Sequence, residues 1–145
     1  MFSFISISGP DGVGKTSTIN AIHKKTDFRY MIYDRDIPDQ VCYTIIAKRK
    51  KCIDVNYYLN FMYNNKEQLY VILNSNLSDI TKRMQLRNDS FVPDNTTLDE
   101  AIRHFKRYES DMSDNILYID NSNLSIENVA NIILDKMNNN NNERV

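Results

Sequence analysis

All three glycines of this 145-residue chain lie in one ten-residue stretch, SGPDGVGKTS, which runs from Ser8 to Ser17. Gly9 to Thr16 fits the pattern G-x-x-x-x-G-K-[ST] at each fixed position. Glycines allow a backbone to wrap a phosphate with its N–H groups, an approach that side chains would block. A helix beginning at Lys15 would add its positive N-terminal end. The stretch is therefore typical of a loop that binds nucleotide phosphates.

Two side chains of this loop have expected roles toward Mg²⁺ and ATP. The Lys15 ammonium would reach the β- and γ-phosphates, and the Thr16 hydroxyl would coordinate the metal. The expected ATP-binding set is Gly9, Asp11, Gly12, Val13, Gly14, Lys15, Thr16 and Ser17. A GTPase is disfavoured because the glycines are confined to this loop, which rules out D-x-x-G elsewhere, and because N-K-x-D does not occur.

A predicted second strand, residues 28–33, is followed by Asp34 and Arg35 in the segment YDRD. In open α/β sheets, ligands bind at the C-terminal ends of the strands. If this strand lies beside the first, Asp34 can orient Mg²⁺ through water or accept a proton from an acceptor hydroxyl. The planar Arg35 guanidinium can clamp phosphate oxygens. A structural salt bridge or a helix cap is the alternative for this pair.

Arg83 and Arg87 are four residues apart on a predicted helix over residues 78–87, with Ser78 as its expected cap, and therefore share one face. The polar loop that follows contains Pro93. Two guanidiniums beside such a loop suit a lid that closes over the transferring phosphate, so we expect both arginines to be catalytic. An ordinary solvated basic face is the alternative.

Strands alternate with helices along the whole chain. The expected strands are 2–8, 28–33, 69–73 and 116–119, and the expected helices are 15–25, 38–48, 54–63, 78–87, 97–112 and 125–137. The strands are continuous apolar runs, which is typical of a parallel sheet covered on both faces. The sequence thus predicts an α/β three-layer sandwich of the P-loop NTPase type, with about four parallel strands in the order 2-1-3-4.

Smaller features complete the expected organisation. Thr97 and Glu100 have the spacing of a capping box. With glycine confined to one loop, left-handed turn positions are expected at Asn and Asp. Residues 1–137 are expected to form one kinase-type domain, and residues 138–145 an Asn-rich disordered tail.

Composition limits the functional class and the compartment. The formal net charge of −1 gives no overall sign of a nucleic-acid binder. No apolar run approaches the roughly 20 residues of a membrane span, and two cysteines without metal-type spacing are most simply free thiols. We therefore expect a cytoplasmic protein without a membrane partner. Abundant Asn, Ile, Lys and Tyr, all with AT-rich codons, suit a virus-encoded protein acting in the host cytoplasm.

In order along the chain, these segments resemble the thymidylate kinases and, more broadly, the deoxynucleoside and nucleoside-monophosphate kinases. The similar pieces are GPDGVGKTS, YDRD, KRMQLR before the expected lid, HFKRYESDM and LSIENVANII. The resemblance implies Asp11 near the acceptor sugar, Asp34 and Arg35 at the reacting phosphates, and Arg83 and Arg87 in the lid. The expected cofactors are ATP and Mg²⁺, with Thr16 and Asp34 at the metal, and the sequence allows a homodimer.

One departure from that family concerns the acceptor. Its members carry a long segment, with an arginine that grips the acceptor phosphate, where this chain has only TDFRYMIY between Lys25 and Asp34. We therefore expect the acceptor site between Asp34 and the segment from Asp39 to Tyr63. The expected substrate-binding residues are Asp11, Asp34, Arg35, Asp39, Gln40 and Tyr43.

The sequence thus predicts a phosphotransferase that moves the γ-phosphate of ATP to a nucleoside or nucleotide. One alternative is a kinase acting on nucleic acid, at a 5′ end or a modified base, for which the cationic run AKRKK (47–51) could meet phosphates. Another is a nucleotide-binding regulatory or assembly module without an acceptor.

Overall fold

The computed structural model describes residues 2–46, 54–87 and 94–142. Its centre is a four-stranded sheet in which all three neighbouring pairs are parallel, in the order β2-β1-β3-β4. The strands are β1 (Phe4–Ser8), β2 (Met31–Asp34), β3 (Gln68–Asn74) and β4 (Ile116–Asp120). The predicted fold class and strand order are both confirmed.

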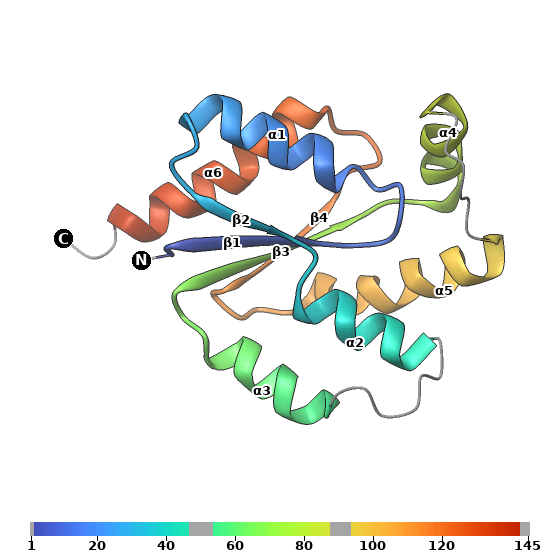
Figure 1. The fold of residues 1–145 in the computed structure, drawn as a ribbon, viewed down its shortest axis with the longest axis horizontal. Helices are drawn as coiled ribbons and strands as arrows, with labels where there is room; N and C mark the ends of the chain where they lie inside the picture. Colours follow the sequence, from blue (N-terminus) through green and yellow to red (C-terminus); the bar gives the residue numbers. More distant parts are fainter. Residues whose placement is uncertain (1, 47–53, 88–93, 143–145) are drawn as a thin grey trace.

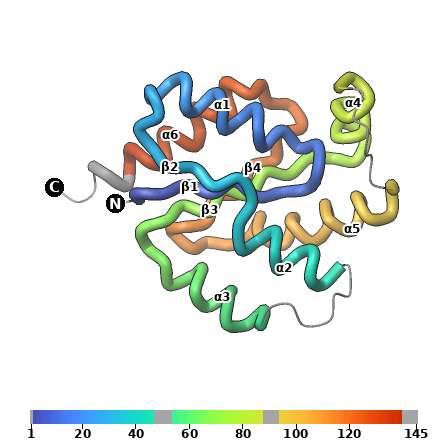
Figure 2. Tube along the Cα trace, viewed as in Figure 1, coloured from blue at the N-terminus to red at the C-terminus, as the bar shows by residue number. Residues whose placement is uncertain are grey.

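Helices cover both faces of the sheet, as Figure 1 shows. On one face lie α1 (Lys15–Thr26) and α6 (Ile126–Asn142), which pack against each other. On the other lie α2 (Ile37–Ile46), α3 (Val55–Asn64) and α5 (Asn95–Lys106), the last continuing into a short 3₁₀ helix, η1 (Arg107–Ser110). In Figure 2, α4 (Leu77–Arg87) lies at the opposite end of the molecule from the start of β1.

The interior strand β3 explains why both faces need cover. All seven of its residues are buried. Leu69, Val71 and Leu73 belong to the core beneath α1 and α6, whereas Tyr70 and Ile72 belong to the core beneath α2, α3 and α5. This alternation gives the continuous apolar run that predicted a parallel sheet. The edge strand β2 is mostly exposed.

The predicted second strand began too early. Residues 28–30 precede β2, and Phe28 is in the left-handed region with φ 58°. The Phe28 ring stacks on His23, with ring centroids 4.7 Å apart, while its N–H donates to the His23 carbonyl. Asp27 is left-handed as the sequence predicted for Asp and Asn, but Phe28 and Arg35 share this conformation and were not foreseen.

The helix boundaries correct three expectations. Asn76, not Ser78, caps α4 by accepting from the Asp79 N–H, and Asp94, not Thr97, caps α5 by accepting from the Thr97 N–H. A suitable polar cap was available two residues earlier in α4 and three residues earlier in α5. The closing helix α6 continues through Asn142, so the first five residues of the expected tail are helical. Within the described residues, no helix has the length and apolarity required to cross a membrane.

Candidate active site around the phosphate loop

The glycines of the loop between β1 and α1 all have positive φ, namely 152°, 77° and 100° for Gly9, Gly12 and Gly14. A Cβ at Gly9 would lie 2.2 Å from the backbone oxygen of Leu73, and a Cβ at Gly12 would lie 2.6 Å from the Met84 Cε. A Cβ at Gly14 would meet nothing within 4 Å. Two glycines therefore permit close packing, and the third leaves open space at the start of α1.

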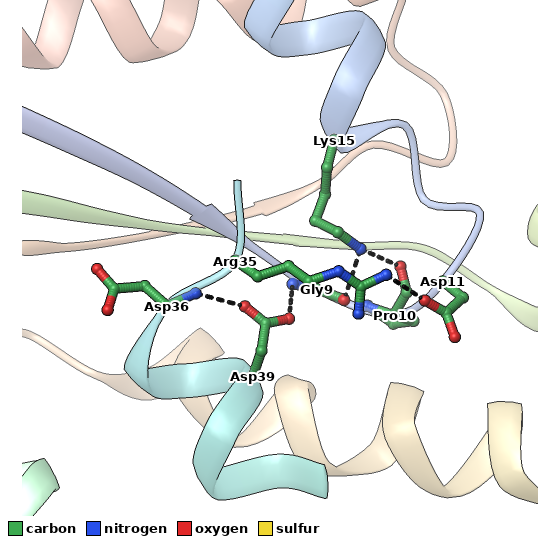
Figure 3. Close-up of polar contacts among 7 residues, drawn as sticks. All are labelled: Gly9, Pro10, Asp11, Lys15, Arg35, Asp36 and Asp39. Carbon is green, nitrogen blue, oxygen red and sulfur yellow. Dashed lines mark hydrogen bonds and ion pairs between the residues drawn. The ribbon is translucent and has the colours of Figure 1, made fainter. Parts of the chain in front are cut away.

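Lys15 is buried at the first position of α1 and turns back over the loop. Its Nζ donates to the carbonyl oxygens of Gly9 and Pro10, each at 2.8 Å (Figure 3). Burial lowers the pKa of the Lys15 ammonium below its ordinary value, and the negative charge of Asp39 opposes that shift. The ammonium therefore lies beside the loop backbone, and its role toward nucleotide phosphates stays a prediction.

Asp39 holds the loop from the other side of the sheet. Its Oδ1 accepts from the Gly9 N–H at 3.2 Å, and its Oδ2 accepts from the Asp36 N–H at 3.0 Å (Figure 3). The carboxylate is only 4% exposed, and burial raises its pKa. Both oxygens thus have backbone partners, so Asp39, expected to bind substrate, positions the phosphate loop and the start of α2.

Arg35 extends from the end of β2 toward the same loop. Its Nη2 lies 2.7 Å from the Asp11 Oδ1 (Figure 3), and its backbone is left-handed with φ 72°. For a bulky residue this conformation carries strain, which is typical of functional sites. The pair joins the loop after β1 to the end of β2, as the alternative salt-bridge interpretation anticipated, while remaining exposed.

A cavity of about 440 Å³ opens on the α4 and α6 side of the loop. Arg83 and Asn121 line this cavity and form hydrogen bonds to the backbone of the loop. The Arg83 Nη1 donates to the Val13 carbonyl at 3.1 Å, and the Asn121 Nδ2 donates to the same oxygen at 2.8 Å. The remaining lining residues are Gly12, Gly14, Ser17, Thr18, Leu86, Arg87, Leu124, Ser125, Ile126 and Val129.

A second cavity, of about 470 Å³, opens on the other side of the loop. It is lined by Asp36 and by all six residues that the sequence assigned to the substrate, namely Asp11, Asp34, Arg35, Asp39, Gln40 and Tyr43. Burial raises the pKa of the Tyr43 hydroxyl, and this hydroxyl can donate or accept a hydrogen bond. The phosphate loop thus lies between two cavities of the size that small ligands occupy.

Several predicted residues lie elsewhere or in other roles. Of the expected acceptor segment, the helix α3 contributes nothing to the second cavity, and its Tyr57 and Phe61 are exposed. Arg87 lines the first cavity together with Arg83, whose guanidinium binds the loop backbone and Asn121. The lid loop (88–93) and the cationic run (47–51) lie outside the described residues.

Sequence reasoning missed Asn121 and Asp36. Asn121 directly follows β4, and Asp36 follows Arg35 after β2. The rule that ligands meet the C-terminal ends of parallel strands was applied to Asp34, and applied to every strand it would have included both residues.

The residues present fit Mg²⁺ and a nucleotide triphosphate. Kinase magnesium sites use few protein ligands, because substrate phosphates and water supply the others. Thr16 is exposed on the first turn of α1, and the exposed Asp34 carboxylate has no hydrogen-bond or ion-pair partner among the described residues. In that same part of the chain no three His, Cys, Asp or Glu side chains form a metal-binding group. A metal here would depend on the nucleotide for most of its ligands.

Comparison with known proteins supports the fold. No family model and no curated protein matches the sequence. The structure is similar to YorR from Bacillus subtilis, solved in complex with phosphorylated GDP, with a TM-score of 0.73, 18% identity and coverage of 93% of this chain and 95% of that chain. Thymidylate kinase from Candida albicans is similar with a TM-score of 0.68 and 14% identity, and the match covers 97% of this chain and 93% of that chain.

Two further structural neighbours are a nucleoside kinase and a sugar kinase. Deoxyadenosine kinase from M. mycoides with bound dCTP has a TM-score of 0.64 and 18% identity, with 93% of this chain and 98% of that chain covered. A gluconokinase from Sinorhizobium meliloti has a TM-score of 0.61 and 14% identity, and the match covers 94% of this chain and 92% of that chain. The chain therefore has the P-loop kinase fold over nearly its full length, and this fold is shared by nucleoside, nucleotide and sugar kinases.

Proposed function

We propose that the protein transfers the γ-phosphoryl group of ATP to a nucleoside or nucleotide acceptor. The observation that carries this proposal is the position of the phosphate loop between two cavities, each of more than 400 Å³. A nucleotide-binding module without an acceptor needs only one of them. Two cavities that flank the buried Lys15 suit a donor and an acceptor whose phosphates meet at this lysine.

The first cavity suits the ATP base and ribose. Apolar side chains from α4, α6 and the loop before α6 line it, and its polar lining residues are Ser17, Thr18, Arg83, Arg87, Asn121 and Ser125. The triphosphate would lie along the loop, where the first N–H groups of α1 have no intrahelical partner. Lys15 would exchange its carbonyl partners for phosphate oxygens, and bound Mg²⁺ would neutralise further charge on them.

The second cavity suits the acceptor. Asp34 stands at the end of β2, beside β1, and its charge acts on Lys15. The acceptor oxygen would form a bond to the γ-phosphorus as the bond from phosphorus to the β–γ bridging oxygen breaks and ADP leaves with that electron pair. The acceptor hydroxyl proton would pass to the Asp34 carboxylate.

The test is transfer of label from γ-labelled ATP by the full chain. The acceptor panel contains the four deoxynucleosides, their 5′-monophosphates, gluconate and an oligonucleotide with a free 5′ hydroxyl. We expect a labelled product with a nucleoside or nucleotide. Label transferred only to gluconate or to the oligonucleotide would contradict the proposed acceptor class, and label found only as inorganic phosphate would contradict a transferase.

A further inference from the structure

The second cavity is strongly acidic. Four carboxylates line it, those of Asp11, Asp34, Asp36 and Asp39, and Arg35 is its one cationic lining residue in the described part of the chain. Clefts lined by one sign of charge focus the potential and select ligands of suitable charge. The charge of this cavity therefore restricts the acceptor.

Its one guanidinium already has a partner. Arg35 Nη2 is 2.7 Å from Asp11 Oδ1, with Asp11 in the loop after β1 and Arg35 directly after β2. A phosphate on the acceptor would have to displace Asp11 from Arg35 and leave that carboxylate beside it. Like-charge juxtaposition of this kind opposes binding in a recognition site. Recognition of an acceptor phosphate is therefore disfavoured here.

The carboxylates differ in what they can still bind. Asp39 accepts from two backbone N–H groups, and Asp36 accepts from the Ile37 N–H and from Gln68 Nε2 at 2.5 Å. Asp34 accepts no hydrogen bond from the described residues, and Asp11 uses only its Oδ1. The cavity thus offers free acceptor atoms on Asp34 and Asp11, which suit a ligand rich in hydroxyl or amino donors.

We infer that the acceptor is an unphosphorylated, uncharged nucleoside, and that nucleoside monophosphates are excluded by the charge of this cavity. The inference rests on the proposed phosphotransferase function. Asp34 and the second oxygen of Asp11 accept hydrogen bonds from the nucleoside hydroxyls, with the exposed Gln40 and the Tyr43 hydroxyl completing the polar wall. The cavity volume of about 470 Å³ lies within the range of small-ligand sites.

The test compares kcat/KM for each deoxynucleoside with kcat/KM for its own 5′-monophosphate, at constant ionic strength. We expect the nucleoside to be preferred by about 100-fold or more, which corresponds to about 2.7 kcal/mol. A second arm changes the charge of the cavity without touching the phosphate loop. Gln40→Arg should shift the ratio toward the monophosphate by about tenfold, and Gln40→Met, of similar length and uncharged, should not shift it.

Each outcome has a distinct meaning. Equal or better use of monophosphates by the wild type would overturn the inference and leave the phosphotransferase function intact, as would an unchanged ratio in Gln40→Arg. Transfer to neither class would also overturn the inference. Label found only on gluconate or the oligonucleotide would also contradict the proposed acceptor class, and phosphotransferase activity itself fails only if the whole panel is negative.

Discussion

The guanidinium of Arg83 donates to the carbonyl oxygen of Val13, 70 residues earlier in the chain, at 3.1 Å. The same oxygen accepts from Asn121, whose own Oδ1 accepts from Arg83 at 3.1 Å. A triangle of hydrogen bonds therefore ties the phosphate loop to α4 and to the loop after β4. Because Val13 is fully buried, the carbonyl has no access to water and depends on these two donors.

Asn121→Leu should destabilise the protein and weaken nucleotide binding. The change removes one donor from the Val13 carbonyl and one acceptor from Arg83, and a buried unpaired group costs about 1–3 kcal/mol. Denaturant unfolding measures the loss. Asn131→Leu on the exposed face of α6 is the control, with an expected change within about 0.5 kcal/mol. In a double-mutant cycle with Arg83→Met, the losses in the free energy of unfolding should be non-additive. Strictly additive losses would contradict the hydrogen-bond triangle of Arg83, Asn121 and Val13.

The three glycines should differ in their response to alanine. Gly9→Ala should be the most destabilising, because its Cβ would meet the Leu73 backbone oxygen, which cannot move without disturbing the β3–β4 pairing, in which Leu73 lies opposite Ile119. Gly12→Ala should cost less, because the Met84 Cε can shift. Gly14→Ala has space and should cost only about 1–2 kcal/mol of backbone strain.

Nucleotide binding should follow a different order. Gly14 lines the first cavity, so a methyl group there would occupy the space expected for phosphate. Thermal unfolding and ATP titration of the three variants separate the two effects. A Gly14→Ala protein that binds ATP as tightly as the wild type would place the phosphates elsewhere.

Asp34→Asn should lower kcat by about 100-fold or more while the Kd for ATP changes by less than about threefold, because the amide keeps the shape but cannot take a proton. Steady-state kinetics and calorimetry provide the two values. Asp135, which is exposed on α6, provides the control. Asp135→Asn also removes one carboxylate and should change neither kcat nor the Kd for ATP. A lowered unfolding temperature with an unchanged single-turnover rate would show that Asp34 has a structural role instead.

The sequence predicted the fold well because its signals were local. The phosphate-loop pattern and the apolar strand runs depend on neighbouring residues, and they led to the correct class and strand order. The caps of α4 and α5 were predicted two and three residues too late, since several polar residues compete for that role at each helix start. The conformation of Phe28 depends on stacking with His23 and could not be read from a β-rich run.

The candidate site was less predictable because its side chains meet across the chain. The phosphate-binding role of Lys15 stays a prediction. The Asp39 carboxylate accepts a hydrogen bond from the Gly9 N–H, 30 residues earlier, and no local pattern indicates that bond. Asn121 donates to the Val13 carbonyl, 108 residues earlier, and these two residues likewise meet only because of the strand order in the sheet. Sequence reasoning therefore identified the residues around the loop better than it identified their hydrogen-bond partners.

Stability should fall as the pH drops below about 6.5, the ordinary pKa of histidine. Burial, with a smaller effect of Arg107, lowers the pKa of His104 in the folded protein. The unfolded chain therefore binds this proton first, so the contribution of neutral His104 is complete above that pH and is lost as the pH falls toward the lowered pKa.

The measurement is the free energy of unfolding at pH 7.5 and at pH 5.5. His104→Gln should reduce the difference between the two values. The other histidine, His23, provides the control His23→Gln, which keeps His104 and should keep the wild-type difference. An unchanged difference in His104→Gln would mean that other groups cause the acid-side loss.

The most direct test of phosphoryl transfer at the loop is the rate of γ-label transfer by Lys15→Met compared with Lys24→Met. Methionine retains the apolar stem of either lysine and removes only the ammonium, which in Lys15 is buried over the loop and in Lys24 is exposed on α1. Loss of the Lys15 charge should lower the rate by about 1,000-fold or more, about 4 kcal/mol of transition-state stabilisation, with the unfolding transition retained. Lys24→Met should match the wild type. A Lys15→Met protein that transfers label within about tenfold of the wild-type rate would contradict the account.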